Sequence, residues 1–313
     1  MRIYFYTDTQ LSGQTPRHRV DNYQKSLLDK IEEVYTAAKK GRADFLICGG
    51  DFFNSHRIFS YELLNRTMDI LCDSGLDTYM VIGQHDLLGY NPTTYKSSTL
   101  AFVVERCPSL RVVWEPVDLG DVTISASHVW DEVMDAGKTP VKDGAFNILI
   151  AHHLLTSKKA MFDVVNTTEF ATKCQLDGGN YDLVLSGDLH EGYPVYEVNG
   201  MWFCNPGSLA RQAINDRERT PQYAVIEAEP NQIPIIDVVP IKCALPGSDV
   251  FGESAVELMR TGTKFDPTAF VEEIGDFEAE SSNVHDLVQK IGKSKGIRTE
   301  VLAYLATKAQ HSS

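Results

Sequence analysis

Residue types that bind metal ions occur at five places where short apolar runs of the sequence end. These places are Asp8-Thr9-Gln10, Asp51-Phe52-Phe53-Asn54, Gln84-His85-Asp86, His152-His153 and Asp188-Leu189-His190. Carboxylates, amides and imidazoles in one cluster are a ligand set for a pair of divalent cations, and two cations need a shared bridging carboxylate. The sequence therefore predicts a two-cation site if the fold brings the five places together.

The segments that carry these residues indicate a parallel α/β core. Apolar runs at 3–6, 45–48 and 79–82 have the length of buried strands, and apolar residues recur at helical spacing in 21–40 and 61–74. Strands that alternate with helices form parallel sheets, and ligands bind beyond the carboxyl ends of such strands. We therefore expect the polar residues to share one edge of a sheet.

The second half of the chain predicts a second sheet that faces the first. Its closely spaced strand candidates are 110–114, 122–125, 146–151, 183–186, 195–198, 201–204 and 223–227. Asn199-Gly200 favours a hairpin turn, and prolines between 230 and 246 indicate a linker. The expected fold class is thus α/β, a two-sheet sandwich flanked by helices. The expected domains are 1–245 and a small, mainly helical appendage at 246–313.

Charge and cysteine content exclude several classes of protein. A formal net charge of -14 argues against a protein that coats nucleic acid unaided, although it suits one that collects carboxylates around metal ions. The six cysteines include no C-x-x-C pair, which favours reduced thiols in a cytoplasmic protein. The apolar run at 1–6 is too short for a signal peptide, and no run is long enough to predict a membrane span.

The five places resemble, in order and spacing, the motifs of calcineurin-like binuclear metallophosphoesterases. Those motifs are D-x-H, G-D, G-N-H-D, H and G-H-x-H, and the resemblance extends over residues 1 to about 228. Within the superfamily, the chain is most similar to SbcD-type DNA repair nucleases. Gly50-Asp51-Phe52-Phe53-Asn54 resembles their G-D-x-F-x loop, and the segment from Asn205 to Arg211 resembles their P-G-S-x-x-R loop.

The resemblance implies a role for each matching residue. Two ligand sets share Asp51: Asp8, Gln10, Asp51 and His190 around one metal, and Asp51, Gln84, His152 and Asp188 around the other. His85 occupies the place of the catalytic histidine beside the scissile phosphate, and Asp86 is expected to orient it. The neighbouring His153 remains an alternative ligand to His152. Such a site would hydrolyse phosphodiesters, because two cations neutralise the growing charge and His85 can supply the proton for the leaving oxygen.

Three ligand positions depart from the family pattern. Gln10 and Asp188 stand where histidines are expected, and Gln84 stands where asparagine is expected. Oxygen-rich sites suit harder cations, so we expect two manganese ions, or magnesium, rather than zinc. A degenerate site that binds one metal or none remains the alternative.

Five residues near the motifs are candidates for contact with substrate. They are Asn54, His56, Arg57, Ser208 and Arg211. Arg211, with the nearby Arg217 and Arg219, could grip a nucleic-acid backbone, or these arginines could pair with the acidic residues between them.

The favoured function is phosphodiester hydrolysis in DNA, as an exonuclease or endonuclease subunit. The resemblance implies an SbcC-type ATPase as partner, with candidate helices in 284–310 as its dock, and a possible homodimer. A phosphodiesterase or phosphatase for a small nucleotide-type substrate shares the same motifs. A non-catalytic adaptor with a degenerate metal site is the third hypothesis.

Overall fold

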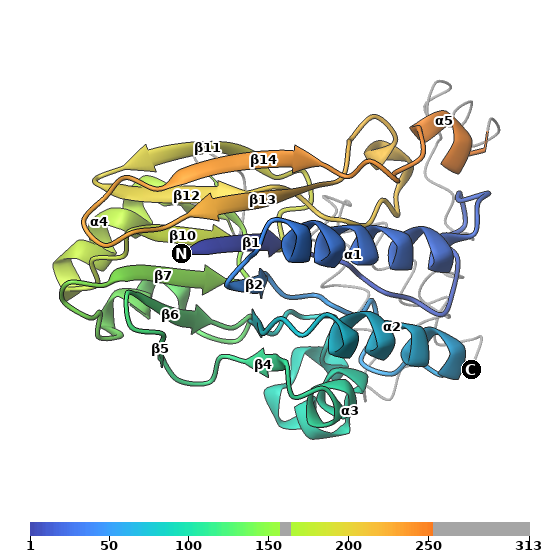
Figure 1. Cartoon of the computed structure of the whole chain (residues 1–313), viewed down its shortest axis with the longest axis horizontal. Helices are drawn as coiled ribbons and strands as arrows, with labels where there is room; N and C mark the ends of the chain where they lie inside the picture. Colours follow the sequence, from blue (N-terminus) through green and yellow to red (C-terminus); the bar gives the residue numbers. More distant parts are fainter. Residues whose placement is uncertain (157–163, 253–313) are drawn as a thin grey trace, which may run out of the picture. The chain divides into compact units, whose positions relative to one another are not determined.

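The structure is a computed structural model that describes residues 1–156 and 164–252, which lie in the compact unit Met1–Glu253. Two six-stranded sheets pack face to face, and helices cover their outer faces (Figure 1). This confirms the expected α/β two-sheet sandwich. The boundary at 245/246 stays a prediction, because most of the appendage and its candidate helices lie outside the described residues.

The first sheet has the order β14-β13-β1-β2-β3-β4. Its strands are β1 Arg2–Tyr6, β2 Phe45–Cys48, β3 Thr78–Met80, β4 Leu110–Val112, β13 Gln222–Glu227 and β14 Ile235–Pro240. The first four run parallel, and β13 pairs antiparallel with both β1 and β14. The segments expected at 110–114 and 223–227 therefore belong to this sheet and not to the second. β14 corrects the expected linker, since Pro240 ends an edge strand where its missing N–H is tolerated.

The second sheet has the order β11-β12-β10-β7-β6-β5. Its strands are β5 Val117–Asp118, β6 Val122–Ser127, β7 Phe146–Ala151, β10 Leu183–Ser186, β11 Tyr193–Val198 and β12 Met201–Asn205. A small separate pair joins β8 Leu155–Thr156 to β9 Val165–Asn166. Asn199 and Gly200 both have positive φ, 55° and 81°, as the turn between β11 and β12 requires. The expected hairpin is therefore confirmed.

Helices cover both sheets. They are α1 Tyr23–Lys40, α2 Tyr61–Asp73, α3 Thr99–Arg106, α4 Thr167–Asp177 and α5 Gly247–Val250, with 3-10 turns at Leu88–Tyr90, Pro92–Ser97, Val133–Lys138 and Ile214–Asp216. The first three pack against the first sheet, and α4 packs against the second. α1 begins after Asn22, whose side chain accepts a hydrogen bond from the Lys25 N–H at 3.0 Å.

The core between the sheets is built from the inward faces of their strands. Ile3, Phe5 and Ile47 of the first sheet share one cluster with Ile148 and Leu185 of the second. These side chains are fully buried, so the sandwich is held by apolar contact across its centre. All six cysteines are free thiols. Among the described residues, no helix combines the length and apolar character needed to cross a membrane.

Candidate metal centre

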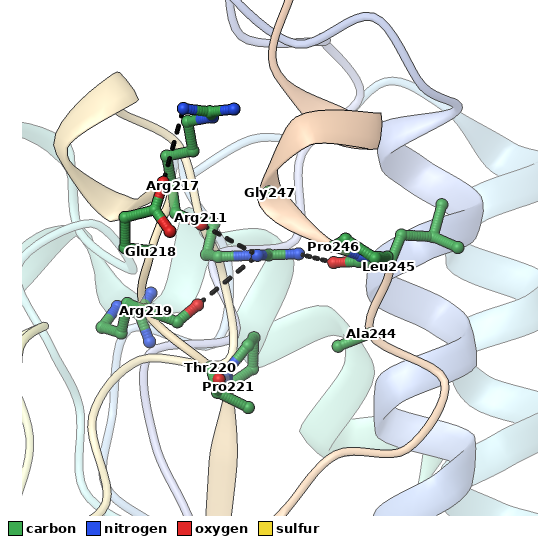
Figure 2. Close-up of a pocket in the computed structure, with 10 residues that line it drawn as sticks. All are labelled: Arg211, Arg217, Glu218, Arg219, Thr220, Pro221, Ala244, Leu245, Pro246 and Gly247. Carbon is green, nitrogen blue, oxygen red and sulfur yellow. Dashed lines mark hydrogen bonds and ion pairs between the residues drawn. The ribbon is translucent and has the colours of Figure 1, made fainter.

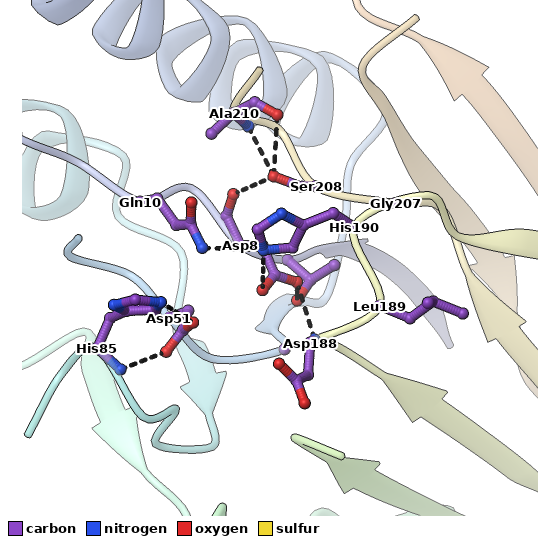
Figure 3. Close-up of polar contacts among 12 residues, drawn as sticks. Asp8, Gln10, Asp51, His85, Asp188, Leu189, His190, Gly207, Ser208 and Ala210 are labelled. Atoms are coloured by element: carbon purple, nitrogen blue, oxygen red, sulfur yellow. Dashed lines mark hydrogen bonds and ion pairs between the residues drawn. The ribbon is translucent and has the colours of Figure 1, made fainter. Parts of the chain in front are cut away.

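Strand ends from both sheets deliver the polar residues to one edge of the sandwich (Figure 3). Asp8 and Gln10 follow β1, Asp51 follows β2, Gln84 and His85 follow β3, His152 follows β7, and Asp188 and His190 follow β10. The contacts below show that the structure brings all eight together. Parallel order explains the convergence, because the carboxyl ends of neighbouring parallel strands lie at the same edge.

Three buried residues form the centre of this cluster. Asp8, Asp51 and His152 each offer one ligand atom, and these atoms lie within 4.8 Å of one another. His152 Nε2 lies 3.6 Å from Asp51 Oδ2, and His190 Nε2 lies 3.6 Å from Asp8 Oδ1. His85 Nε2 lies 3.8 Å from Asp51 Oδ2. Asp51 thus faces histidines on two sides, as a bridging carboxylate would.

The donor atoms of the cluster fit a group that would take them all. Nine buried side-chain atoms among the described residues have no hydrogen-bond partner. Five of them belong to this cluster: Asp8 Oδ1, Gln10 Oε1, Asp51 Oδ2, Gln84 Oε1 and His152 Nε2. Leaving one buried polar atom unpaired costs about 1–3 kcal/mol. Five in one place, all able to donate a lone pair, therefore match divalent cations.

His152, and not His153, belongs to the cluster. Its Nδ1 donates to the Gly49 carbonyl at 2.6 Å, which leaves Nε2 facing Asp51 as a free lone pair. Burial opposes protonation of His152, but the charges of Asp51 and Asp8 outweigh burial and hold its pKa well above the usual value. The cluster therefore favours positive charge at its centre. His153 instead hydrogen-bonds the Ser127 hydroxyl at 2.9 Å.

The two glutamines pair with other candidate ligands. Gln10 Nε2 lies 2.9 Å from His190 Nε2, and Gln84 Nε2 donates to Asp188 Oδ1 at 2.6 Å. Each amide is thereby oriented by its nitrogen, while its carbonyl oxygen has no partner. Glutamine at these positions can therefore present an oxygen to a cation where the family pattern has histidine or asparagine.

The backbone of the cluster is strained in a way that the sequence did not indicate. Asp8, Gln10, Asp51 and Asp188 have φ angles of 49°, 43°, 48° and 71°. Residues other than glycine rarely adopt this left-handed region, and each instance costs on the order of 1–3 kcal/mol. Hydrogen bonds between loops hold the geometry, since Asp8 N donates to the Gly50 carbonyl and Gln10 N to the Asp51 carbonyl, at 3.1 and 3.0 Å.

Glycines permit the close approach of these loops. A Cβ at Gly83 would lie 2.1 Å from Asp51 Oδ1, and a Cβ at Gly50 would lie 2.4 Å from His152 Nδ1. Any side chain at either position would displace a candidate ligand. The glycines that precede the polar residues in the motifs thus have a steric reason.

Asp86 has a different role from the one expected. Its buried carboxylate accepts hydrogen bonds from the backbone N–H groups of Phe53 and Gly83, at 3.0 and 3.1 Å, and from Phe52 at 3.4 Å. Burial and the negative charge of Asp51 raise the pKa of Asp86 to about 7. Asp86 therefore ties the loop after β2 to the loop after β3, instead of orienting the His85 ring.

Ser208 and Arg211 also depart from expectation. Ser208 is fully buried, and its hydroxyl donates to the Asp8 carbonyl at 2.8 Å. Arg211 is 3% exposed, and its guanidinium donates to backbone carbonyls, among them that of Leu245. Neither side chain is available to a substrate at the metal centre, because both are buried and bonded to backbone. Their place is the support of the loop that follows β12.

The other three candidates for substrate contact lie after β2. Asn54 accepts a hydrogen bond from Gln212 Nε2 at 2.7 Å, which ties it to the loop after β12. His56 is half-buried and Arg57 is exposed. Contact between these residues and a substrate stays a prediction.

An aromatic group lies at the same edge and was not expected from the sequence. Trp114 follows β4 and Trp130 follows β6, and both strands end at the edge that carries the cluster. The Trp114 ring lies 5.0 Å from that of Tyr95 and 6.3 Å from that of Trp130, and Trp114 is 53% exposed. Nearby, partial burial and the charges of Asp51 and Asp188 raise the pKa of Tyr90. No spacing in the sequence could have indicated this group, because its members come from three separate loops.

Solved structures with similar folds include three with informative titles. TT1561 of Thermus thermophilus is 15% identical, with a TM-score of 0.49, and the match covers 77% of this chain and 99% of that one. A dimetal phosphatase from Danio rerio is 11% identical, with a TM-score of 0.49 and the same coverage. The calcineurin-like phosphoesterase YfkN from Bacillus subtilis is 13% identical, with a TM-score of 0.48, covering 83% of this chain and 96% of that one. A search of curated proteins gave no match.

The sequence itself matches a protein family. The match is to the calcineurin-like phosphoesterases and spans residues 1–192, from β1 through the last candidate ligand, His190. The family implies divalent metal ions at a binuclear site, which agrees with the unpaired donor atoms described above. Since the match covers more than half of the 313 residues, the chain belongs to the calcineurin-like phosphoesterase family and is a metal-dependent phosphoesterase.

Proposed function

We propose that this phosphoesterase hydrolyses phosphodiester bonds in DNA, as a nuclease subunit similar to the SbcD type. The observation that carries the proposal is the aromatic group beside the metal centre, with Trp114 exposed between Tyr95 and Trp130. Aromatic rings at a catalytic edge provide stacking surfaces for nucleobases, and such stacking tolerates any base sequence. The similarity of the segment 205–211 to the SbcD loop supports the same substrate class.

The residues of the cluster define what the protein would contribute to the reaction. Divalent ions held by the candidate ligands would lower the pKa of a water molecule and neutralise charge on the phosphate oxygens. The His85 ring is 37% exposed and is held beside Asp51 by its own backbone N–H, which donates to Asp51 Oδ1 at 2.9 Å. His85 can therefore reach substrate and give a proton to the leaving oxygen.

Product analysis tests the substrate class. Linear single-stranded and double-stranded DNA should be degraded in manganese, and cyclic nucleotides should be hydrolysed much more slowly than DNA at equal phosphodiester concentration. Bis(p-nitrophenyl) phosphate reports on the metal centre alone and serves as the activity control. Faster turnover of cyclic nucleotides than of DNA would favour the small-molecule phosphodiesterase instead.

Replacing Trp114 by Ala should weaken the use of DNA without damaging the metal centre. Loss of one stacked base is worth roughly 1–3 kcal/mol, so kcat/KM on a single-stranded oligonucleotide should fall about tenfold, mainly through KM. The rate on an abasic strand of the same length should change little. Tyr61→Ala removes another exposed aromatic ring, at the start of α2, and is the matched control. An equal loss on the abasic strand would contradict a stacking role.

Metal reconstitution tests the proposed ion. Of the seven candidate ligands, only His152 and His190 offer nitrogen, and the others offer carboxylate or amide oxygen. Metal-stripped protein should therefore regain more activity with manganese than with zinc, and magnesium should give intermediate activity. The measurement is the rate on bis(p-nitrophenyl) phosphate at matched free metal concentrations. Higher activity with zinc would show that the amide oxygens do not bind the ions.

The proposed partner is an SbcC-type ATPase, and a homodimer is proposed for the nuclease itself. The proposed dock within 284–310 lies outside the described residues. A chain truncated after residue 252 keeps Phe251, which is buried and packs on Arg19. This truncated chain should retain hydrolysis of bis(p-nitrophenyl) phosphate and lose association with the ATPase in a co-purification assay. Unchanged association would remove the basis for the docking segment.

A further inference from the structure

A second concentration of unpaired polar atoms lies in a cavity formed by the loop after β12 and the segment 244–247. The cavity has a volume of about 190 Å³, and Arg211, Arg217 and Arg219 line it (Figure 2). The buried Nε atom of each of these arginines has no hydrogen-bond partner. Of the nine unpaired atoms among the described residues, five are in the metal cluster and three are in this cavity. The cluster presents acceptors that fit a cation, whereas the cavity presents donors that fit an anion.

The arginines of the cavity are only partly compensated by carboxylates. Arg219 Nε lies 3.6 Å from Asp216 Oδ1, and Arg217 pairs with Glu218 at 3.4 Å. Arg211 is almost completely buried, and its hydrogen-bond partners are carbonyl oxygens. A buried guanidinium without a carboxylate is costly unless another anion compensates it.

Lys30 shows that the positive charge is in excess. It is fully buried, and its Nζ donates to the Leu209 carbonyl at 2.8 Å. Burial, together with the positive charges of Arg211, Arg19 and Arg219, lowers its pKa to about 7. Arg19 itself is neutralised by Asp21 at 2.7 Å. The field that acts on Lys30 therefore comes mostly from the arginines of the cavity.

The cavity is separate from the metal centre. The loop 207–211 lies between the two, with the Ala210 N–H donating to the Asp8 carbonyl at 3.2 Å. On its other side, the carbonyls of Ser208 and Ala210 accept hydrogen bonds from the Arg219 guanidinium. A ligand in the cavity would therefore contact the loop that holds Asp8 without touching the metal ligands.

We propose that this cavity is a binding site for a phosphate-class oxyanion, held by the guanidinium groups of Arg211, Arg217 and Arg219. Guanidinium forks match the geometry of phosphate oxygens and form charge-assisted hydrogen bonds with them. The ligand is either a free phosphate compound or a phosphate of a nucleic-acid backbone, which have the same recognition chemistry. The site goes beyond the proposed function, since it would operate whatever the metal centre hydrolyses.

Calorimetric titration of the full chain tests the site. Protein stripped of metals with EDTA is titrated with inorganic phosphate at constant ionic strength, so that phosphate cannot be held by metal ions. Saturable binding should be weakened about tenfold or more by Arg217→Gln. Arg111→Gln removes an equivalent exposed charge from β4 and should leave binding unchanged. Absence of saturable binding by the wild-type protein, or equal binding by Arg217→Gln, would overturn the proposal.

Two further arms strengthen and resolve the test. Arg211→Lys keeps the charge but loses the fork, so phosphate affinity should fall even where circular dichroism shows an intact fold; unchanged affinity in a folded variant would count against the site. A nucleoside monophosphate and a short single-stranded oligonucleotide are then titrated separately. Competition between phosphate and the monophosphate identifies a free ligand. Oligonucleotide binding that is lost in Arg217→Gln identifies a backbone phosphate.

Discussion

Replacing Asp51 by Asn is expected to reduce phosphodiester hydrolysis by about a thousandfold or more, because stabilisation by metal ions contributes several kcal/mol to such reactions. Asp51 is fully buried, and its Oδ2 faces both His152 and His85, at 3.6 and 3.8 Å. Asn keeps the shape of the side chain but removes the negative charge and half of the ligating oxygen. The measurement is kcat on bis(p-nitrophenyl) phosphate and on DNA, with metal content determined on the same samples.

Loss of activity in this variant should not come from loss of fold. Asp8 and Asp51 repel each other, and this repulsion contributes, after burial, to the raised pKa of Asp8. Thermal unfolding of the metal-free variant should therefore occur at or above the temperature of the metal-free wild type. Asp118→Asn, at an exposed ion pair with Lys142, is the matched control and should keep full activity. Full activity of Asp51→Asn would instead favour the adaptor hypothesis.

Replacing His85 by Gln should reduce DNA hydrolysis by roughly 10²- to 10⁴-fold, the usual contribution of a general acid or base. The leaving group in DNA is an alkoxide, which needs a proton as the bond to phosphorus breaks. A p-nitrophenolate leaving group needs no such proton. The loss with bis(p-nitrophenyl) phosphate should therefore be much smaller than the loss with DNA.

The comparison of the two substrates separates proton donation from metal binding. A variant that damages the metal centre loses both activities together, as expected for Asp51→Asn. His18→Gln alters a histidine outside every motif and should leave both rates unchanged. Equal losses of His85→Gln on both substrates would mean that His85 supports the ions or the phosphate and does not donate the proton.

The sequence predicted the fold and the convergence of the polar residues because both depend on local patterns. Buried strands such as Phe45–Cys48 appear as short apolar runs, and parallel order places their ends at one edge. The roles of Asp86, Ser208 and Arg211 depend on tertiary contacts instead. Each of these side chains bonds to backbone that is distant in the sequence, such as Ser208 to Asp8, and no spacing along the chain encodes such a bond.

Other features escaped prediction for the same physical reason. β14 follows a proline-rich stretch, and its pairing with β13 outweighs the local signal for a linker. Trp114 and Tyr95 meet through tertiary packing alone. His152 could not be distinguished from His153 by type or position. Only the hydrogen bond from its Nδ1 to Gly49 shows which ring faces Asp51.

The left-handed backbone at Asp8, Gln10, Asp51 and Asp188 has a consequence for the evolution of this protein. Glycine adopts that conformation without strain, so glycine at any of the four positions would relieve part of the local cost. A selection for thermal stability alone would therefore enrich glycine where the catalytic ligands stand. A selection that also demands turnover would retain the strained residues and gather its stabilising changes elsewhere, so the two lineages would diverge first at the ends of β1, β2 and β10.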